Sequence, residues 1–330
     1  MTESGTADVS VMTVARDHCT ARELATHMIT KRQQSGMTLV EVLVAVAIIV
    51  ILAGLLAASI QKARGIALRI SCSNNLRQLG LGLHQYHDIN AVLPPGVAHP
   101  LLLPGIPRAY GPDTDPYPLL NWHARLLPFL EQESLWKQTV QAYAEDPFFI
   151  EVPPHSSSTI TVPIFLCPAD ILAPVPNFPD GKVPAPASFL GVSGTTDSRH
   201  DGLLYLDSRV RFSEIRDGMS DTLMVGERPP EWEQFWGQWY GGWGRWGRGV
   251  AYLGVRETDV QDDECPQGPY AFMRDSIQNR CSVYHFWSQH AGGANFLFAD
   301  GSVHFLAYSA VAVMPALATR AGDEVFSLPD

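Results

Sequence analysis

Apolar residues form one long uninterrupted block near the N-terminus and only short runs in the rest of the chain. From Leu39 to Ile60 the only charged residue is Glu41, whereas the preceding segment, 1–36, is polar. At about 1.5 Å per residue, a helix of this length spans roughly 33 Å, which matches the hydrocarbon core of a bilayer. The pattern therefore predicts a membrane-spanning helix over about 39–60.

Helical periodicity continues beyond the apolar block. Apolar side chains recur there at spacings of three or four residues, at Leu68, Cys72, Leu76, Leu79, Leu83 and Tyr86. Such a stripe gives the helix one face that packs against a globular domain. The helix is expected to end near Ile89–Asn90, ahead of Pro94-Pro95-Gly96. We therefore predict a single helix over 37–90, half of it membranous and half amphipathic.

Short strand-like runs and turn sequences dominate residues 91–330. Asp217-Gly218 predicts a turn before a buried strand over 222–225. Near the C-terminus, two runs flank Asp300-Gly301 and predict a β-hairpin over 294–307, closed by a two-residue type I′ turn. The predicted fold class is α+β, a long N-terminal helix followed by a large antiparallel β-rich head.

Composition narrows the possible functions. The 330 residues carry a net charge of −11, and 46% of them are hydrophobic. Roughly 240 residues follow the helix, which suits one large domain or two small ones. An acidic chain without clustered Lys and Arg lacks the surface that phosphate backbones require, so we expect no nucleic-acid partner.

Five cysteines are present, and the first, Cys19, lies in the polar N-terminal segment. Cys72, Cys167, Cys265 and Cys281 remain, and an even number outside the membrane favours disulfides. Four cysteines allow three connectivities, and free buried thiols are the alternative. No pair has C-x-x-C spacing, so the sequence predicts neither a zinc site nor a redox motif.

The start of the apolar block resembles a known processing site. Gly36-Met37-Thr38-Leu39-Val40-Glu41 is similar to the cleavage and methylation motif of type IV prepilins and type II secretion pseudopilins, although Met37 stands where phenylalanine is commoner. The resemblance implies that prepilin peptidase cuts after Gly36, and that the new amino group is methylated. It also implies that Glu41 pairs with the N-terminal amine of a neighbouring subunit.

A plain signal peptide or signal anchor is the alternative. Its apolar core is typically about 7–15 residues, shorter than this block, and it would have no use for Glu41. Basic residues flank the block on both sides, at Lys31, Arg32, Lys62, Arg64 and Arg69. The positive-inside rule is therefore ambiguous, and the processing motif sets the orientation. The leader 1–36 is long, so Met28 competes with Met1 as the translation start.

A second resemblance begins on the amphipathic part of the helix. The segment 72–88, followed by Leu93-Pro94-Pro95-Gly96, is similar to a bacterial family that is abundant in planctomycetes and combines a prepilin-type N-terminus with a domain of unknown function, number 1559. Cys167-Pro168-Ala169-Asp170 fits the same family. The resemblance implies that Cys72 pairs with Cys167, which leaves Cys265 for Cys281.

The predicted C-terminal hairpin carries a further element of this kind. Nine residues separate His290 from Asp300-Gly301, which matches the H-X9-DG element described as prepilin-processing-associated. We expect His290 to hydrogen-bond the adjacent glycine loop and brace the hairpin. A catalytic role would require a nucleophile or a metal beside it, and the sequence specifies neither.

Metal sites are weakly indicated. His84 and His87 share a helix face, but the sequence places no third ligand with them. Asp217, Asp221 and Glu227 offer oxygen ligands to calcium, but their spacing is not that of an EF-hand loop. We expect no cofactor, with calcium as the less favoured possibility.

The least expected stretch is a tryptophan-rich insert over 231–249. Its tryptophans lie among glycines, at Trp232, Trp236, Trp239, Trp243 and Trp246. They would serve either as an aromatic platform for a glycan or partner, or as rings that fill the core, and we favour the core role.

These observations predict a pilin-like or pseudopilin structural subunit, not an enzyme. Its partners would be prepilin peptidase, other subunits through the N-terminal helix, and membrane lipid. It would be a single-pass protein of the bacterial cytoplasmic membrane, with its head over 91–330 outside the cytoplasm, in a type IV pilus or a type II secretion pseudopilus. The alternative is a membrane-anchored module that binds a glycan or surface polymer through the tryptophan-rich insert.

Overall fold

The computed structural model describes residues 37–98, 115–147, 149, 152–170, 184–231, 236–242, 249–258, 260 and 262–324. The chain divides into two compact units, Met1–Ala57 and Ala58–Asp330. We refer to the second unit as the head, and it includes the C-terminal part of the first helix.

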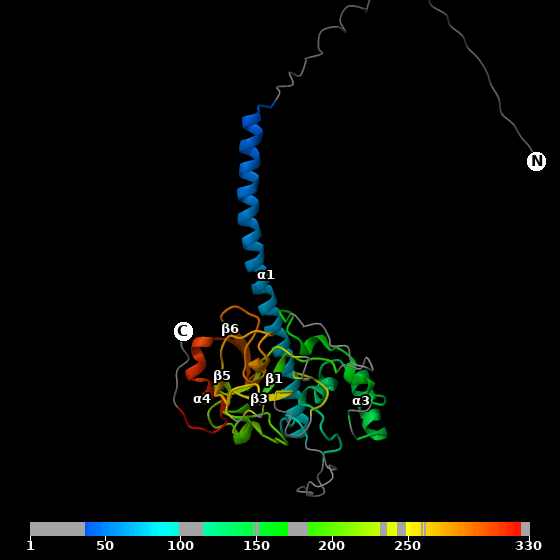
Figure 1. The fold of residues 1–330 in the computed structure, drawn as a ribbon. Coiled ribbons are helices and arrows are strands. Elements are labelled where there is room, and N and C mark those ends of the chain that lie inside the picture. The colour runs from blue at the N-terminus through cyan, green and yellow to red at the C-terminus, as the bar shows by residue number, and fades with distance from the viewer. Residues whose placement is uncertain are drawn as a thin grey trace, which may run out of the picture. The chain divides into compact units, whose positions relative to one another are not determined.

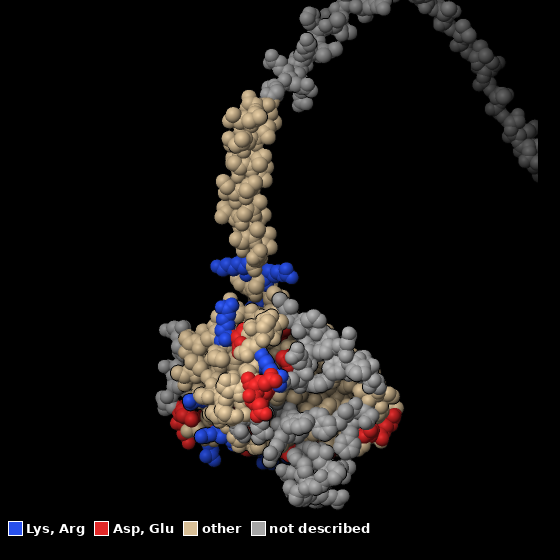
Figure 2. Space-filling view, in the orientation of Figure 1, with Lys and Arg blue, Asp and Glu red and all other residues tan. Residues whose placement is uncertain are grey.

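Helix α1 (Leu39–Asn90) is continuous over the range that the sequence predicts (Figure 1). Its side chains are exposed from Leu39 to Ala67, as expected for a segment without a protein partner in a single chain. The helix is long and apolar enough to cross a membrane. On the face that Figure 2 shows, the N-terminal part of the helix displays no charged side chain before a band of basic ones, and the first basic residues after the apolar block in the sequence are Lys62 and Arg64.

The head is built on a five-stranded sheet with the strand order β3-β1-β2-β6-β7. These strands are β1 (Phe189–Gly194), β2 (Leu223–Glu227), β3 (Tyr252–Gly254), β6 (Gly293–Phe298) and β7 (Val303–Ala307). A two-stranded sheet pairs β4 (Arg256–Glu257) with β5 (Tyr270–Ala271). The other α-helices among the described residues are shorter, namely α2 (Trp122–Arg125), α3 (Glu133–Glu145) and α4 (Met314–Ala318).

The α+β class is confirmed, but the main sheet is mixed. Strands β1, β2, β6 and β7 are antiparallel neighbours, whereas β3 pairs with β1 in parallel. The expectation of an antiparallel head was therefore wrong at this edge. A parallel pair needs a long crossover connection, and the chain between β1 and β3 supplies one that contains β2 and the tryptophan-rich insert.

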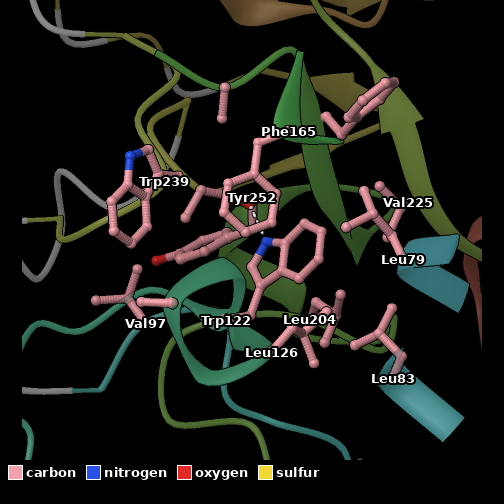
Figure 3. Close-up of a cluster of buried hydrophobic side chains, with 14 of the residues drawn as sticks. Leu79, Leu83, Val97, Trp122, Leu126, Phe165, Leu204, Val225, Trp239 and Tyr252 are labelled. Atoms are coloured by element: carbon pink, nitrogen blue, oxygen red, sulfur yellow. Dashed lines mark hydrogen bonds between the residues drawn. The ribbon is translucent and has the colours of Figure 1, made fainter. Parts of the chain in front are cut away.

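Strand β6 lies between two hydrophobic cores because its successive side chains point to opposite faces of the sheet. Leu297 belongs to the core that contains the α1 residues Leu76, Leu79 and Leu83. Phe296 belongs to the other core, which contains residues of α4. Figure 3 shows the first core, where the leucines of α1 approach the sheet from one side and a group of aromatic rings fills the space beside them. The amphipathic half of α1 is thus an integral part of the head.

The C-terminal hairpin forms, with a turn that differs from the predicted one. The amide of Gly301 donates to the carbonyl of Phe298, and the amide of Phe298 donates to Ser302. Only Gly301 in this loop has a positive φ, 86°, whereas a type I′ turn needs two such residues. The connection is therefore a three-residue loop that ends in a left-handed glycine. Gly301 alone supplies the positive φ that this chain reversal needs.

Candidate functional site

The N-terminal motif forms a compact hydrogen-bonded start to α1. Glu41 Oε2 accepts hydrogen bonds from the amide of Thr38, at 2.8 Å, and from its hydroxyl, at 2.9 Å. In return, the amide of Glu41 donates to Thr38 Oγ1 at 3.3 Å. This reciprocal arrangement is a capping box, which satisfies amide groups that the helix leaves without partners. Met37 precedes it with 69% of its surface exposed, and Gly36 lies outside the described residues.

The four cysteines of the head form two disulfides. Cys72 on α1 bonds to Cys167, 95 residues further along the chain. Cys265 bonds to Cys281, which closes a loop of 16 residues. These are the pairs that the family resemblance implies. The first disulfide attaches α1 covalently to the segment that leads into Asp170.

A buried polar cluster surrounds the first disulfide. His290 Nε2 lies 3.4 Å from Cys167 Sγ and 3.4 Å from Glu227 Oε1. Asn295 binds the same carboxylate twice. Its backbone amide donates to Glu227 Oε2 at 2.7 Å, and its side-chain Nδ2 donates to Glu227 Oε1 at 2.9 Å. The side chains of His290 and Glu227 are only 4% and 2% exposed. Hydrogen bonds to a buried carboxylate offset part of the cost of removing it from water.

Different elements bring these side chains together. Glu227 is the last residue of β2, and Asn295 lies on the adjacent strand β6. The backbone amide of His290 donates to Ser288 Oγ, and that hydroxyl donates to the carbonyl of Gly293 at 2.7 Å. The turn before β6 therefore fixes the position of His290. The predicted hydrogen bond from His290 to the glycine loop is indirect, because its backbone amide reaches Gly293 only through Ser288, while its imidazole contacts the disulfide and Glu227.

Two further charged groups lie close to this cluster. Burial raises the pKa of Asp170 to about 7, and the nearby Glu227 carboxylate acts in the same direction, while Ser188, His290 and Arg228 oppose it. Burial lowers the pKa of Arg228 to about 9. The Arg228 guanidinium donates to the carbonyl oxygens of Pro229 and Gly249. The site thus concentrates ionisable groups in a region from which water is largely excluded.

The histidines of α1 attach the helix to the rest of the head. His84 Nε2 lies 2.8 Å from the carbonyl oxygen of Ala299, in the hairpin loop. His87 Nε2 accepts a hydrogen bond from the amide of Phe212 and stacks on its ring at 4.0 Å. Desolvation by burial lowers the pKa of His87, which favours the neutral acceptor form. Both imidazoles therefore have partners in the backbone of the head.

The three carboxylates considered for calcium are used separately. Asp217 accepts hydrogen bonds from the amides of Gly322 and Asp323, and so holds the C-terminal segment. Asp221 accepts one from the hydroxyl of its neighbour Ser220, and Glu227 belongs to the buried cluster. In the part of the chain that the structure describes, these three carboxylates do not form a common group of ligands.

The described tryptophans of the insert belong to the interior. Trp239 is fully buried, and its indole N–H donates to the carbonyl of Ile160 at 2.9 Å. Trp236 is partly buried and packs edge-on against Tyr284. The other tryptophans of the insert, Trp232, Trp243 and Trp246, lie outside the described residues. For Trp239, this placement is the core role that the sequence favours.

The sequence did not identify Asn295, a member of the buried cluster, or Asp170, which lies close to it, as parts of this site. Glu227 was considered only as a calcium ligand. The sequence does contain a signal that Glu227 is buried and paired. It directly follows the apolar run 223–226, and a charged residue in that place is typical of a paired charge at the end of a buried strand. No comparable signal marks Asn295, since only the pairing of β2 with β6 places it beside the carboxylate.

The arrangement is suited to attachment. The sulfur atoms of Cys72 and Cys167 are bonded to each other in the disulfide, so neither residue presents a free thiol as a nucleophile. Asp300, the acidic residue of the C-terminal H-X9-DG element, is exposed, and its carboxylate accepts a hydrogen bond from the amide of Ser302 within its own turn. The cluster therefore connects α1, β2 and β6 at one point of the head.

Two family models match this chain. The prokaryotic N-terminal methylation motif matches residues 31–57, which include the capping box and most of the apolar block. The model described as a protein of unknown function (DUF1559) matches residues 61–311, or 251 of 330 residues. No curated protein and no solved structure matches this chain. The chain therefore belongs to the DUF1559 family and is a type IV pilin-like protein that carries the prokaryotic N-terminal methylation motif.

Proposed function

We propose that this protein is a structural subunit that prepilin peptidase processes between Gly36 and Met37. It then assembles, through α1, into a type IV pilus or a type II secretion pseudopilus, or associates with one. The observation that carries the proposal is the geometry of the motif, where Glu41 is the only charge in an exposed apolar helix segment. A carboxylate at such a position is costly in lipid and calls for a cationic partner.

Cleavage after Gly36 would supply such a partner, since it creates a positively charged amine at Met37 in every subunit. In the single chain, the only hydrogen bonds to the Glu41 carboxylate are those from Thr38, among the residues that the structure describes. Both are made to Oε2 within the same turn of helix. In a bundle of α1 helices, the carboxylate would neutralise the amine of the next subunit, and both groups would become tolerable in an apolar surrounding.

The disulfides support a location of the head outside the cytoplasm. Disulfides persist in oxidising compartments and are rare in the cytosol. Two of them in the head therefore favour an orientation in which the leader faces the cytoplasm and the head lies beyond the membrane.

The experiment compares Glu41→Val with Val44→Ala, a matched change at another exposed position of the same helix. We expect both variants to have an N-methylated Met37 by mass spectrometry of membrane-extracted protein, because neither changes the cleaved bond. Only Glu41→Val should lose incorporation into sheared filaments or into crosslinked oligomers. Normal incorporation of Glu41→Val, or an intact leader on the unmodified chain, would contradict the proposal.

A further inference from the structure

Four side chains with metal-binding atoms converge at the first disulfide. They are Cys72, Cys167, Glu227 and His290, and all are buried. One ligand atom from each lies within 4.8 Å of those of the other three. We call this group the Cys–His–Glu cluster. It draws its ligands from α1, from the segment after Phe165, from the end of β2 and from the turn before β6.

The donor set fits zinc. Zinc in closed protein sites takes four ligands in a tetrahedron, with bonds of about 2.3 Å to thiolate and about 2.0–2.2 Å to imidazole or carboxylate. Such bonds place the ligand atoms roughly 3–4 Å apart, and His290 Nε2 already lies 3.4 Å from both Cys167 Sγ and Glu227 Oε1. The two sulfur atoms, now bonded at 2.01 Å, would have to separate.

Supporting groups for such a site are already in place. Asn295 donates two hydrogen bonds to Glu227 and so fixes the orientation of the carboxylate. The hydroxyl of Ser288 accepts a hydrogen bond from the backbone amide of His290 at 3.0 Å and so fixes the backbone there. Outer contacts of this kind hold ligands in position and raise the affinity of metal sites.

We propose that reduction of the Cys72–Cys167 disulfide converts the Cys–His–Glu cluster into a closed zinc site, with both thiolates, His290 and Glu227 as ligands. A dithiol reductant supplies two electrons and two protons and becomes a disulfide, while the protein disulfide becomes two thiols. Binding of the zinc ion then displaces one proton from each thiol. Every newly synthesised chain passes through the dithiol form before oxidation. In that form, zinc would hold α1 to the head as the disulfide does later.

The second disulfide lacks such a set of ligands. In the part of the chain that the structure describes, the Cys–His–Glu cluster is the only group of at least three such ligands within binding distance. Cys265 and Cys281 have no histidine in a comparable arrangement there, so their reduction should create no four-ligand site.

The test uses the full chain in detergent with Cys19, Cys265 and Cys281 replaced by alanine, so that Cys72 and Cys167 are the only cysteines. After reduction with a water-soluble phosphine, Co²⁺ is added as a spectroscopic substitute for Zn²⁺. We expect one equivalent to bind with a thiolate-to-cobalt charge-transfer band and tetrahedral ligand-field bands, and Zn²⁺ to displace it. The oxidised protein should show neither band.

Substitutions of the ligand His290 and of the supporting residue Asn295 test the site further. Asn295→Ala should weaken cobalt binding by about 10- to 100-fold, as loss of a supporting group does at known sites. His290→Ala should alter the ligand-field bands, and His290→Cys should restore tight binding with stronger charge transfer. Absence of the bands in the reduced protein, or bands unchanged in His290→Ala, would overturn the proposal. If His290→Ala does not fold, His290→Cys decides, since failure of that variant to bind cobalt also overturns it.

Discussion

The two disulfides of the head should contribute unequally to its stability. A disulfide stabilises mainly by restricting the unfolded chain, and the effect grows with the length of the loop that it closes. For a separation of 95 residues the chain-entropy relation gives about 4.7 kcal/mol, and for 16 residues it gives about 3 kcal/mol. Replacing Cys72 and Cys167 by alanine should therefore cost more than replacing Cys265 and Cys281.

Packing adds to this difference. Cys72 and Cys167 are 0% and 3% exposed and belong to the main core, so alanine at these positions leaves a void that costs about 1 kcal/mol. Cys281 is only partly buried and belongs to a small satellite cluster. We expect the total difference between the two double variants to be about 2–3 kcal/mol.

Urea unfolding of the full chain in detergent, followed by tryptophan fluorescence, measures this difference. All eight tryptophans lie after residue 90, so the signal reports on the head. The reasoning would be refuted if Cys265→Ala/Cys281→Ala lost as much unfolding free energy as Cys72→Ala/Cys167→Ala. The dependence of the unfolding free energy on urea concentration is compared as well, because a change in that slope would show that the compactness of the unfolded state also differs.

Three further predictions concern the head. His290→Ala should lower the unfolding free energy by about 2–4 kcal/mol, since it removes a buried ring beside a buried carboxylate, and calorimetry should show a lower melting temperature. Burial lowers the pKa of His123 to about 3, below its ordinary 6.5, so the folded state binds fewer protons than the unfolded state. Stability should therefore fall as pH drops from 6.5 towards 3, by up to about 5 kcal/mol in total, and His123→Gln should flatten this acid limb in urea titrations. Gly80→Ala should lower the unfolding free energy by up to about 2 kcal/mol, because the new Cβ would lie 2.8 Å from Leu297 Cδ1. Gly65→Ala, in open space on the same helix, should instead raise it by up to about 1 kcal/mol.

Each of these has an outcome that contradicts it. An unchanged melting temperature in His290→Ala would remove the structural role assigned to the imidazole. An acid limb equally steep in His123→Gln would mean that other groups carry the pH dependence. Equal effects of the two glycine substitutions would show that α1 does not approach the sheet as closely as the contact to Leu297 indicates.

Much of this protein is determined by local sequence. The apolar block and the stripe that follows it predict a helix over 37–90, and α1 runs from Leu39 to Asn90, because helical periodicity depends only on neighbouring turns of the chain. The turn at Asp300-Gly301 was also located correctly, since a glycine can adopt the positive φ that the reversal needs. The disulfide partners, in contrast, followed from family resemblance, because cysteine positions alone allow three connectivities.

Tertiary structure decided the rest. The parallel pairing of β3 depends on a crossover that brings distant segments to one sheet edge, and no local pattern encodes its direction. The environment of His290 depends on the registration of β2 with β6, which brings Glu227 and Asn295 together, and on the disulfide that α1 contributes. The sequence shows which residues carry the chemistry, but their mutual distances are set by packing between elements that are far apart along the chain.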